Sequence, residues 1–176
     1  DIYLSGNVRE KLREAQAALD DGNKAMAANV AALQEVMPED VLYFNIETKL
    51  GATWVPSDAY KGYIAHMLSR ESVEGIDVSF QSGRWRVRLD SDLNRSAEAS
   101  TNYGTGHVTF SRLAQAAMSN QTLRLTSRDS DGNDVYDPEK SEEANARISK
   151  MREDFGAWLW GDLERRQDLE REYNEA

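Results

Sequence analysis

Apolar residues in the first part of the chain recur with the period of a helix. The members of a first series lie three or four positions apart: Leu4, Val8, Leu12, Ala15 and Leu19. This spacing predicts an amphipathic helix that ends at Gly22. A second series predicts another helix, halted by a proline at position 38: Met26, Val30, Leu33 and Met37. Because the connection between them is short, residues 4–37 are predicted to form a helical hairpin.

The next stretch is predicted to hold two helices separated by a glycine and a proline. The spacing of Ile46 and Leu50 predicts a short helix that the following glycine stops, and Trp54 is expected to be buried after it. Pro56 then opens a further helix with Ser57 as its cap. The apolar stripe of this helix consists of Tyr60, Ile64, Met67 and Leu68.

The hydrophobic period then changes to that of a strand. Apolar and polar residues alternate over 76–80 and again over 84–89, and Gln81-Ser82-Gly83 between them suits a turn. This pattern predicts a β-hairpin with one buried face, on which Trp85 lies opposite a row of arginines. Residues 90–106 are polar and show no period, so we expect a loop there.

The last part of the chain returns to helical periodicity. Residues 110–118 predict one helix, while Leu123 and Leu125 alternate as in a strand. The Asp131-Gly132 pair predicts a turn, with Val135-Tyr136 as the returning strand. Two helices are predicted to close the chain, the first with Ala144, Ile148, Met151, Phe155 and Leu159 as its apolar face and the second capped near Asp162.

Together these elements predict an α+β fold that is mostly helical. A chain of 19.8 kDa with 40% hydrophobic residues can bury one core, so a single domain over residues 1–176 is expected. Within it we predict the helical hairpin 4–37, an α+β middle 41–136 with one or two small antiparallel β-hairpins, and a C-terminal pair of helices over 138–174.

Charge and cysteine content exclude several classes of site. The net charge of −10 argues against a broad nucleic-acid-binding surface, which needs clustered Lys and Arg. However, residues 129–176 hold 15 of the 31 acidic residues and only 7 of the 21 basic ones, so a local basic face elsewhere remains open. The absence of cysteine excludes disulfides and a thiolate zinc site.

The polar face of the β-hairpin predicted over residues 76–89 is the main candidate for nucleic-acid contact. Its alternate positions place guanidinium groups about 6.6 Å apart per step, a spacing that can follow a phosphate backbone. The alternative is a solvated face that protects a sheet edge, with Asp77 and Asp90 placed to offset some of the charge. The candidate residues for DNA contact are Arg84, Arg86 and Arg88, with Arg95 in the segment that follows.

Three tryptophans form the second candidate set. Trp54, Trp158 and Trp160 could offer a stacking platform for bases, but tryptophans at helical spacing beside Phe155 more often fill a core or a domain interface. We therefore expect an interface between domains at these positions.

The remaining motifs favour structural roles. His66 and His107 lie far apart in the sequence and have no cysteine to complete a zinc site, so no metal ligands are predicted. Residues 129–134 resemble a calcium loop, but Pro138 takes the place of the required glutamate, which favours a hairpin turn. Gly104-Thr105-Gly106 lacks the further residues of a phosphate-binding loop and is expected to shape a helix entry.

Several separated blocks resemble one family of very large DNA-modification proteins. Those proteins, from phages and mobile elements, join an adenine-specific DNA methyltransferase to a Snf-type superfamily-two helicase in one polypeptide. The most informative block is Glu47–Pro56, with the sequence ETKLGATWVP. The other blocks, in order, are residues 3–12, 29–40, 103–105, 155–160, 164–166 and 173–175, with a weaker stretch around 71–100.

The resemblance implies a place between the two enzymes. The Asn-Pro-Pro-aromatic element of an adenine methyltransferase and the Gly-Lys-Thr/Ser loop of a helicase do not occur in the sequence. Because the chain begins at Asp1 and the family pattern continues on both sides, we expect a fragment of a larger protein.

The resemblance therefore implies a non-catalytic connector domain; the alternative is a DNA-binding or target-recognition module of the same protein. No cofactor is expected in this fragment, while the parent would use S-adenosylmethionine and ATP with magnesium. The implied partners are the neighbouring methyltransferase and helicase domains, with DNA as a possible further partner, in the cytoplasm of a bacterial or phage-infected cell.

Overall fold

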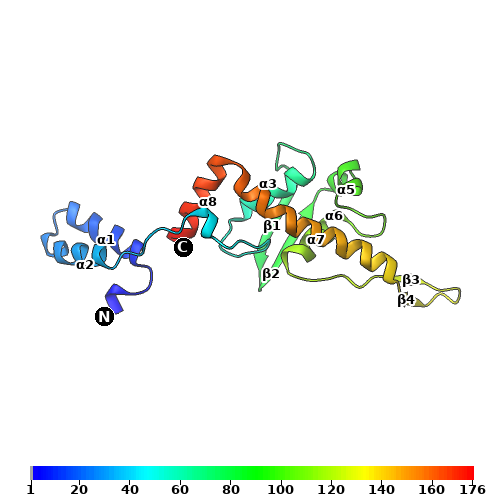
Figure 1. Cartoon of the computed structure of the whole chain (residues 1–176), viewed down its shortest axis with the longest axis horizontal. Coiled ribbons are helices and arrows are strands. Elements are labelled where there is room, and N and C mark those ends of the chain that lie inside the picture. The colour runs from blue at the N-terminus through cyan, green and yellow to red at the C-terminus, as the bar shows by residue number, and fades with distance from the viewer. Residues whose placement is uncertain (1) are drawn as a thin grey trace. The chain divides into compact units, whose positions relative to one another are not determined.

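The computed structural model describes residues 2–176, and its internal contacts divide the chain into two compact units. The first unit consists of Asp1–Ile46 with Gln167–Ala176, and the second of Glu47–Arg166. Helices dominate both units, and the strands of the described residues form two antiparallel two-stranded sheets (Figure 1). The predicted α+β, mostly helical fold class is confirmed.

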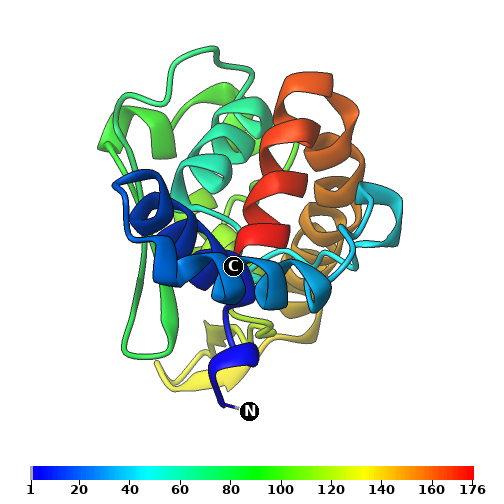
Figure 2. The ribbon, with the colours of Figure 1, turned by 90° about the vertical axis from the view of Figure 1, so that its left-hand side faces the viewer.

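The first unit is built around the predicted helical hairpin. Its elements are η1 (Ile2–Leu4), α1 (Val8–Asp20), η2 (Lys24–Met26), α2 (Ala27–Glu35), η3 (Tyr43–Asn45) and the last residues of α8 (Leu163–Glu175). The side chain of Asn7 accepts a hydrogen bond from the Glu10 N–H over 3.0 Å and caps α1. Helices α1 and α2 lie side by side (Figure 2) around a core of Val8, Ala15, Val30 and Leu33.

The segment after α2 is held by side chains from both ends of the chain. The Arg9 guanidinium forms an ion pair with Asp40. The Asn174 amide accepts a hydrogen bond from the Val41 N–H over 2.7 Å and donates one to the Val41 carbonyl over 2.9 Å. This paired contact satisfies both backbone groups of one residue, as a neighbouring strand would.

The second unit packs helices around the first β-hairpin. Its elements are α3 (Ser57–Met67), β1 (Ile76–Gln81), β2 (Arg84–Leu89), α4 (Ser91–Asn94), α5 (Ala97–Thr101), α6 (Phe110–Met118), β3 (Thr126–Arg128), β4 (Asp134–Tyr136), α7 (Pro138–Gly161) and the start of α8. Helix α3 packs on β1, α6 packs on β2, and α7 packs against both helices (Figure 1). The rings of Tyr60, Tyr63 and Phe155 meet in the core, with centroids 5.1 to 5.5 Å apart in the two contacts that Phe155 makes.

Three predictions between residues 46 and 57 are wrong. Residues 46–49 form no helix. The side chains of Ile46 and Leu50 are buried, but the segment between them is irregular. Trp54 is half-buried, where full burial was expected. Ser57 is the first residue of α3 and makes no capping hydrogen bond, since Pro56 occupies the cap position.

The segment predicted as a loop over 90–106 contains two short helices, α4 and α5. In α5 the Ser96 side chain accepts a hydrogen bond from the Ala99 N–H over 3.2 Å and caps the helix. Helices of four or five residues are too short for a hydrophobic period to develop, which explains the missed elements.

The second hairpin begins later than its apolar residues indicate. Strand β3 starts at Thr126, because the backbone groups of Leu123 and Leu125 pair with side chains of α7. Asn145 accepts from the Leu123 N–H over 2.8 Å, and Ser141 accepts from the Leu125 N–H over 2.8 Å. Among residues 2–176, no helix combines the length and apolar character needed to cross a bilayer.

Candidate nucleic-acid interface

The turn of the β1–β2 hairpin fixes the register of the candidate face. Ser82 and Gly83 both have a left-handed backbone, with φ of 51° and 76°. Positive φ at both central residues defines a type I′ turn, whose twist matches the twist of the strands. The turn therefore pairs β1 and β2 directly, with Phe80 opposite Trp85 and Gln81 opposite Arg84.

The three strand arginines lie on one exposed face, as predicted. Arg84, Arg86 and Arg88 alternate with the buried side chains of Trp85 and Val87. Among the described residues, none of the three guanidinium groups takes part in an ion pair. None of the three charges is therefore neutralised by a direct ion pair among the described residues.

The partners of these arginines on β1 differ in charge. Arg84 lies opposite Gln81, and Arg86 lies opposite Ser79, so both have neutral cross-strand neighbours. Arg88 lies opposite Asp77. The positive potential of the face is thus concentrated toward the turn.

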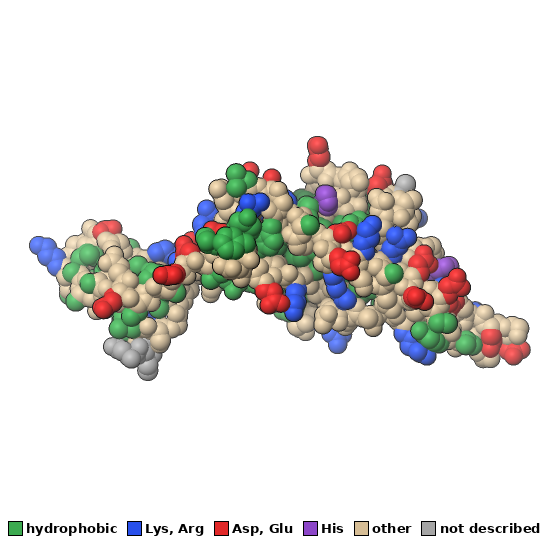
Figure 3. Space-filling model, viewed as in Figure 1, with side chains coloured by type: hydrophobic (Ala, Val, Ile, Leu, Met, Phe, Trp, Pro, Cys, Tyr) green, Lys and Arg blue, Asp and Glu red, His purple; other side chains and the backbone are tan. Residues whose placement is uncertain are grey.

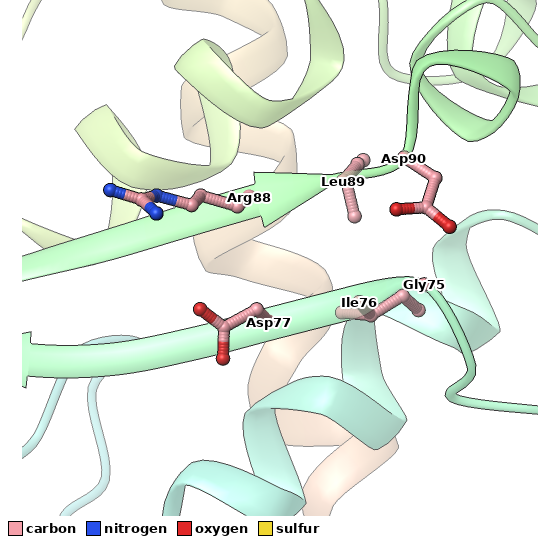
Figure 4. A pocket seen from close by; sticks show the side chains of 6 residues that line it. All are labelled: Gly75, Ile76, Asp77, Arg88, Leu89 and Asp90. Carbon is pink, nitrogen blue, oxygen red and sulfur yellow. The ribbon is translucent and has the colours of Figure 1, made fainter.

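A hollow of about 500 Å³ at the other end of the hairpin is lined by residues that include Asp77, Arg88 and Asp90. Figure 4 shows Asp77 and Arg88 on the facing strands, with Asp90 and Gly75 where the strands end. The Asp90 N–H donates to the Gly75 carbonyl over 3.0 Å and closes this end. Of the two carboxylates, only Asp77 lies opposite Arg88 on the facing strand, while the Arg88 guanidinium extends away from Asp90 (Figure 4).

Arg95 does not join the arginine face. It stands at the end of α4, where its Nε donates to the Ser91 carbonyl over 3.1 Å and its guanidinium lies 4.0 Å from Asp92. On the face of the second unit that Figure 3 shows, basic and acidic side chains are interspersed. That distribution fits a local contact with an anion better than a broad one.

Phe80 is a surface residue that the alternating pattern did not predict. It shares the core face of the hairpin with Trp85, and the two ring centroids lie 5.0 Å apart. Nevertheless the Phe80 side chain is 45% exposed, because it stands next to the turn, beyond the packed part of the sheet. Its position beside Gln81-Ser82-Gly83 is the sequence signal that points to this exposure.

Two of the three candidate tryptophans line different hollows. Trp54 lines a hollow of about 700 Å³ beside Leu50 and Met118. Trp158 lines a different hollow of about 550 Å³, and its ring is covered by the Arg165 guanidinium at 3.8 Å. Trp54 and Trp158 therefore face different hollows.

Trp158 and Trp160 also mark the end of α7, where two arginines bind the last carbonyl groups. Arg165 donates to the Trp158 carbonyl over 2.6 Å, and Arg166 donates to the Trp160 carbonyl over 2.8 Å. Burial lowers the pKa of the Arg165 guanidinium. Cationic side chains at a helix C-terminus satisfy orphan carbonyls and interact favourably with the helix dipole.

The block 47–56 is held in place by the Tyr60 side chain and by close approach to the backbone of Met118. The Tyr60 hydroxyl accepts from the Gly51 N–H over 3.0 Å and donates to the Ala52 carbonyl over 2.8 Å. Gly51 has φ of 96°, and a Cβ on it would lie 1.9 Å from the Met118 carbonyl oxygen. Backbone approach and conformation together require glycine at this position.

The aromatic-Gly-Thr block also makes structural contacts. The Tyr103 hydroxyl donates to Asp154 over 2.8 Å, and Lys150 lies 4.9 Å from the centroid of its ring. Burial and this hydrogen bond raise the pKa of Tyr103 to about 12. The side chain of Thr109 caps the N-terminus of α6, the helix that follows.

Other candidate motifs have structural explanations. Asp129 accepts hydrogen bonds from the N–H groups of Asp131 and Asn133, both over 2.9 Å, as expected for a hairpin turn. His66 is exposed on α3 and His107 is exposed in the loop before α6. Within the part of the chain that the structure describes, no group of three His, Asp or Glu side chains is placed to hold a metal ion.

The fold and the candidate face define a helical α+β protein with a basic β-hairpin. Residues 49–176 match the model of a family described as Domain of unknown function (DUF8437), and the chain belongs to this family. No curated protein matches the chain. No solved structure matches it either.

Proposed function

We propose that this chain is a non-catalytic connector in a DNA-modification protein that carries a DNA methyltransferase and a helicase on one polypeptide. In this role it holds the two enzymes at defined positions. The blocks that resemble such proteins provide the motivation, and the contacts of their residues provide the structural support.

The observation that carries the proposal is that residues of the family-like blocks form hydrogen bonds, close packing contacts and ion pairs with other parts of the same chain. Gly51 is fixed by Tyr60 and by the backbone of Met118. Asn174 satisfies both backbone groups of Val41. Residues used in this way set the shape of the protein, which is the requirement for a connector.

The implied partners are the enzymatic domains on either side. Contact with them would use exposed apolar side chains such as Phe44 in the first unit and Leu163 in the second, which are 66% and 62% exposed. S-adenosylmethionine and ATP with magnesium would then bind the neighbouring domains. This protein would act in the cytoplasm of a bacterial or phage-infected cell.

The reading frame around this chain tests the proposal. A methyltransferase motif upstream and a phosphate-binding loop downstream are expected. As a functional test, the purified chain should transfer no methyl group from S-adenosylmethionine and hydrolyse no ATP. Turnover of either kind, at a rate that scales with the concentration of the chain, would remove the proposal.

A second candidate function is DNA binding through the arginine face. The specific observation in its favour is that Arg84 and Arg86 are exposed, lie opposite neutral residues and form no ion pair within the described part of the chain. Binding to duplex DNA should weaken steeply with salt, because each phosphate contact releases a counterion. Arg86→Ala should weaken it further, whereas no detectable binding at low salt would eliminate this function.

A further inference from the structure

The tip of the β1–β2 hairpin combines two kinds of side chain that suit different parts of a DNA duplex. One face carries the guanidinium groups of Arg84 and Arg86, which are exposed. The opposite face carries Phe80, whose ring is 45% exposed and rests against Trp85. A binding partner that contacts both faces of the tip would therefore meet positive charge on one face and an aromatic ring on the other.

The dimensions of the tip fit a groove. Two paired strands lie about 4.8 Å apart, and the major groove of B-form DNA is about 12 Å wide, so it admits a two-stranded ribbon. The type I′ turn at Ser82 and Gly83 forms the tip of the hairpin, and a Cβ built on Gly83 would meet nothing within 4 Å. No side chain of the turn glycine obstructs close approach to a groove floor.

The charge pattern sets the direction of entry. Asp77 and Asp90 stand at the end of the hairpin away from the turn. These carboxylates would repel phosphates there, while Arg84 and Arg86 would attract them nearer the turn. A polyanion is therefore drawn to the turn end of the ribbon.

We propose that the hairpin enters the DNA major groove turn-first, with Arg84 and Arg86 on backbone phosphates and Phe80 against the methyl groups of thymines. This inference rests on the second candidate function and adds the groove and the base contact to it. Phosphate contacts position a protein on DNA, whereas apolar contact with the thymine methyl distinguishes bases.

Two DNA duplexes of equal length test the base contact, one with thymidine and one with deoxyuridine opposite every adenine, since these differ only in that methyl group. The full chain should bind the thymine duplex about two- to fourfold more tightly, the fold-change expected for burying a methyl group. Phe80→Ala should bind both duplexes equally. Val135→Ala, which truncates a 49% exposed side chain on the other hairpin, should keep the preference.

The outcomes separate this inference from the function on which it rests. Equal binding of both duplexes by the unaltered chain, or a preference that survives in Phe80→Ala, overturns the groove contact. Arg86→Gln should weaken binding to both duplexes alike and reduce the dependence of log K on log salt by about 0.9. If the unaltered chain binds neither duplex at low salt, the DNA-binding function fails and the groove contact fails with it. If Phe80→Ala does not fold, the comparison of the two duplexes with the unaltered chain decides.

Discussion

The indole Nε1 of Trp85 donates a hydrogen bond to the carbonyl of Gly51 over 2.7 Å. This contact ties the buried face of the arginine hairpin to the block that most resembles DNA-modification proteins. Because the Gly51 N–H also donates to the Tyr60 hydroxyl, the two segments share one partly buried hydrogen-bond network. The position of the arginine hairpin therefore depends on Trp85, Gly51 and Tyr60, which lie outside its exposed face.

Trp85→Phe tests the strength of this link. The substitution keeps an aromatic ring but removes the donor, and it leaves the Gly51 carbonyl without its partner. Loss of a buried hydrogen bond and of part of a packed ring should lower the free energy of unfolding by about 2 kcal/mol. Urea unfolding measures this change. Tyr136→Phe removes only the hydroxyl of a 43% exposed side chain and should change stability by less than about 0.5 kcal/mol. Equal effects of both variants would contradict the role of Trp85.

Gly51→Ala should be far more damaging than an alanine at another glycine. The new Cβ would stand 1.9 Å from the Met118 carbonyl oxygen, at a φ of 96° that side chains rarely adopt. We expect a loss of about 3 kcal/mol or more. Gly156, within α7, has open space around it, and Gly156→Ala should stabilise by about 0.5–1 kcal/mol. Thermal unfolding compares the two; a mild effect at Gly51 would show that the loop can move away from α6.

Tyr103 should give the protein a specific alkaline transition. Burial and the hydrogen bond to Asp154 raise the pKa of Tyr103 from 10.0 to about 12. Since the pKa is raised in the folded state, the contribution of Tyr103 is fully present below pH 10 and is lost as the pH rises through about 12. Denaturant unfolding across this window should show a smaller decline in Tyr103→Phe. An identical decline in both proteins would refute the assignment.

Asp77→Asn should strengthen DNA binding if the arginine face binds DNA. The change removes the carboxylate opposite Arg88 and so frees its positive charge. Affinity at low salt should rise, and the salt dependence should become steeper as one more phosphate contact forms. Asp131→Asn makes the same charge change in the turn of the other hairpin and should have a smaller effect. Fluorescence anisotropy with a labelled duplex measures both, and equal gains would show that only net charge matters.

The long periodic elements of this fold were predictable because each repeats its apolar positions over several turns. The face of α7 from Ala144 to Leu159 and the alternation around Trp85 are of this kind. Where the period was short it misled, since Ile46 and Leu50 are four residues apart and buried without a helix between them. In that case two buried side chains four residues apart do not indicate a helix.

The candidate interface was predictable only in part. Alternation alone places Arg84, Arg86 and Arg88 on one face, and the structure shows that face exposed. The neutral partners of Arg84 and Arg86, and the exposure of Phe80, follow from strand register and from where the core ends. The register depends on the turn type, and the exposure of Phe80, although its place beside the turn points to it, depends on where the helices stop covering the sheet.

Sedimentation velocity of the chain mixed with the polypeptides encoded on either side of it tests the connector proposal most directly. We predict that the chain sediments in one complex with both the methyltransferase and the helicase parts, and that omitting the chain separates them. If the two enzymatic parts associate equally well without it, or if the chain binds neither, the connector proposal is contradicted.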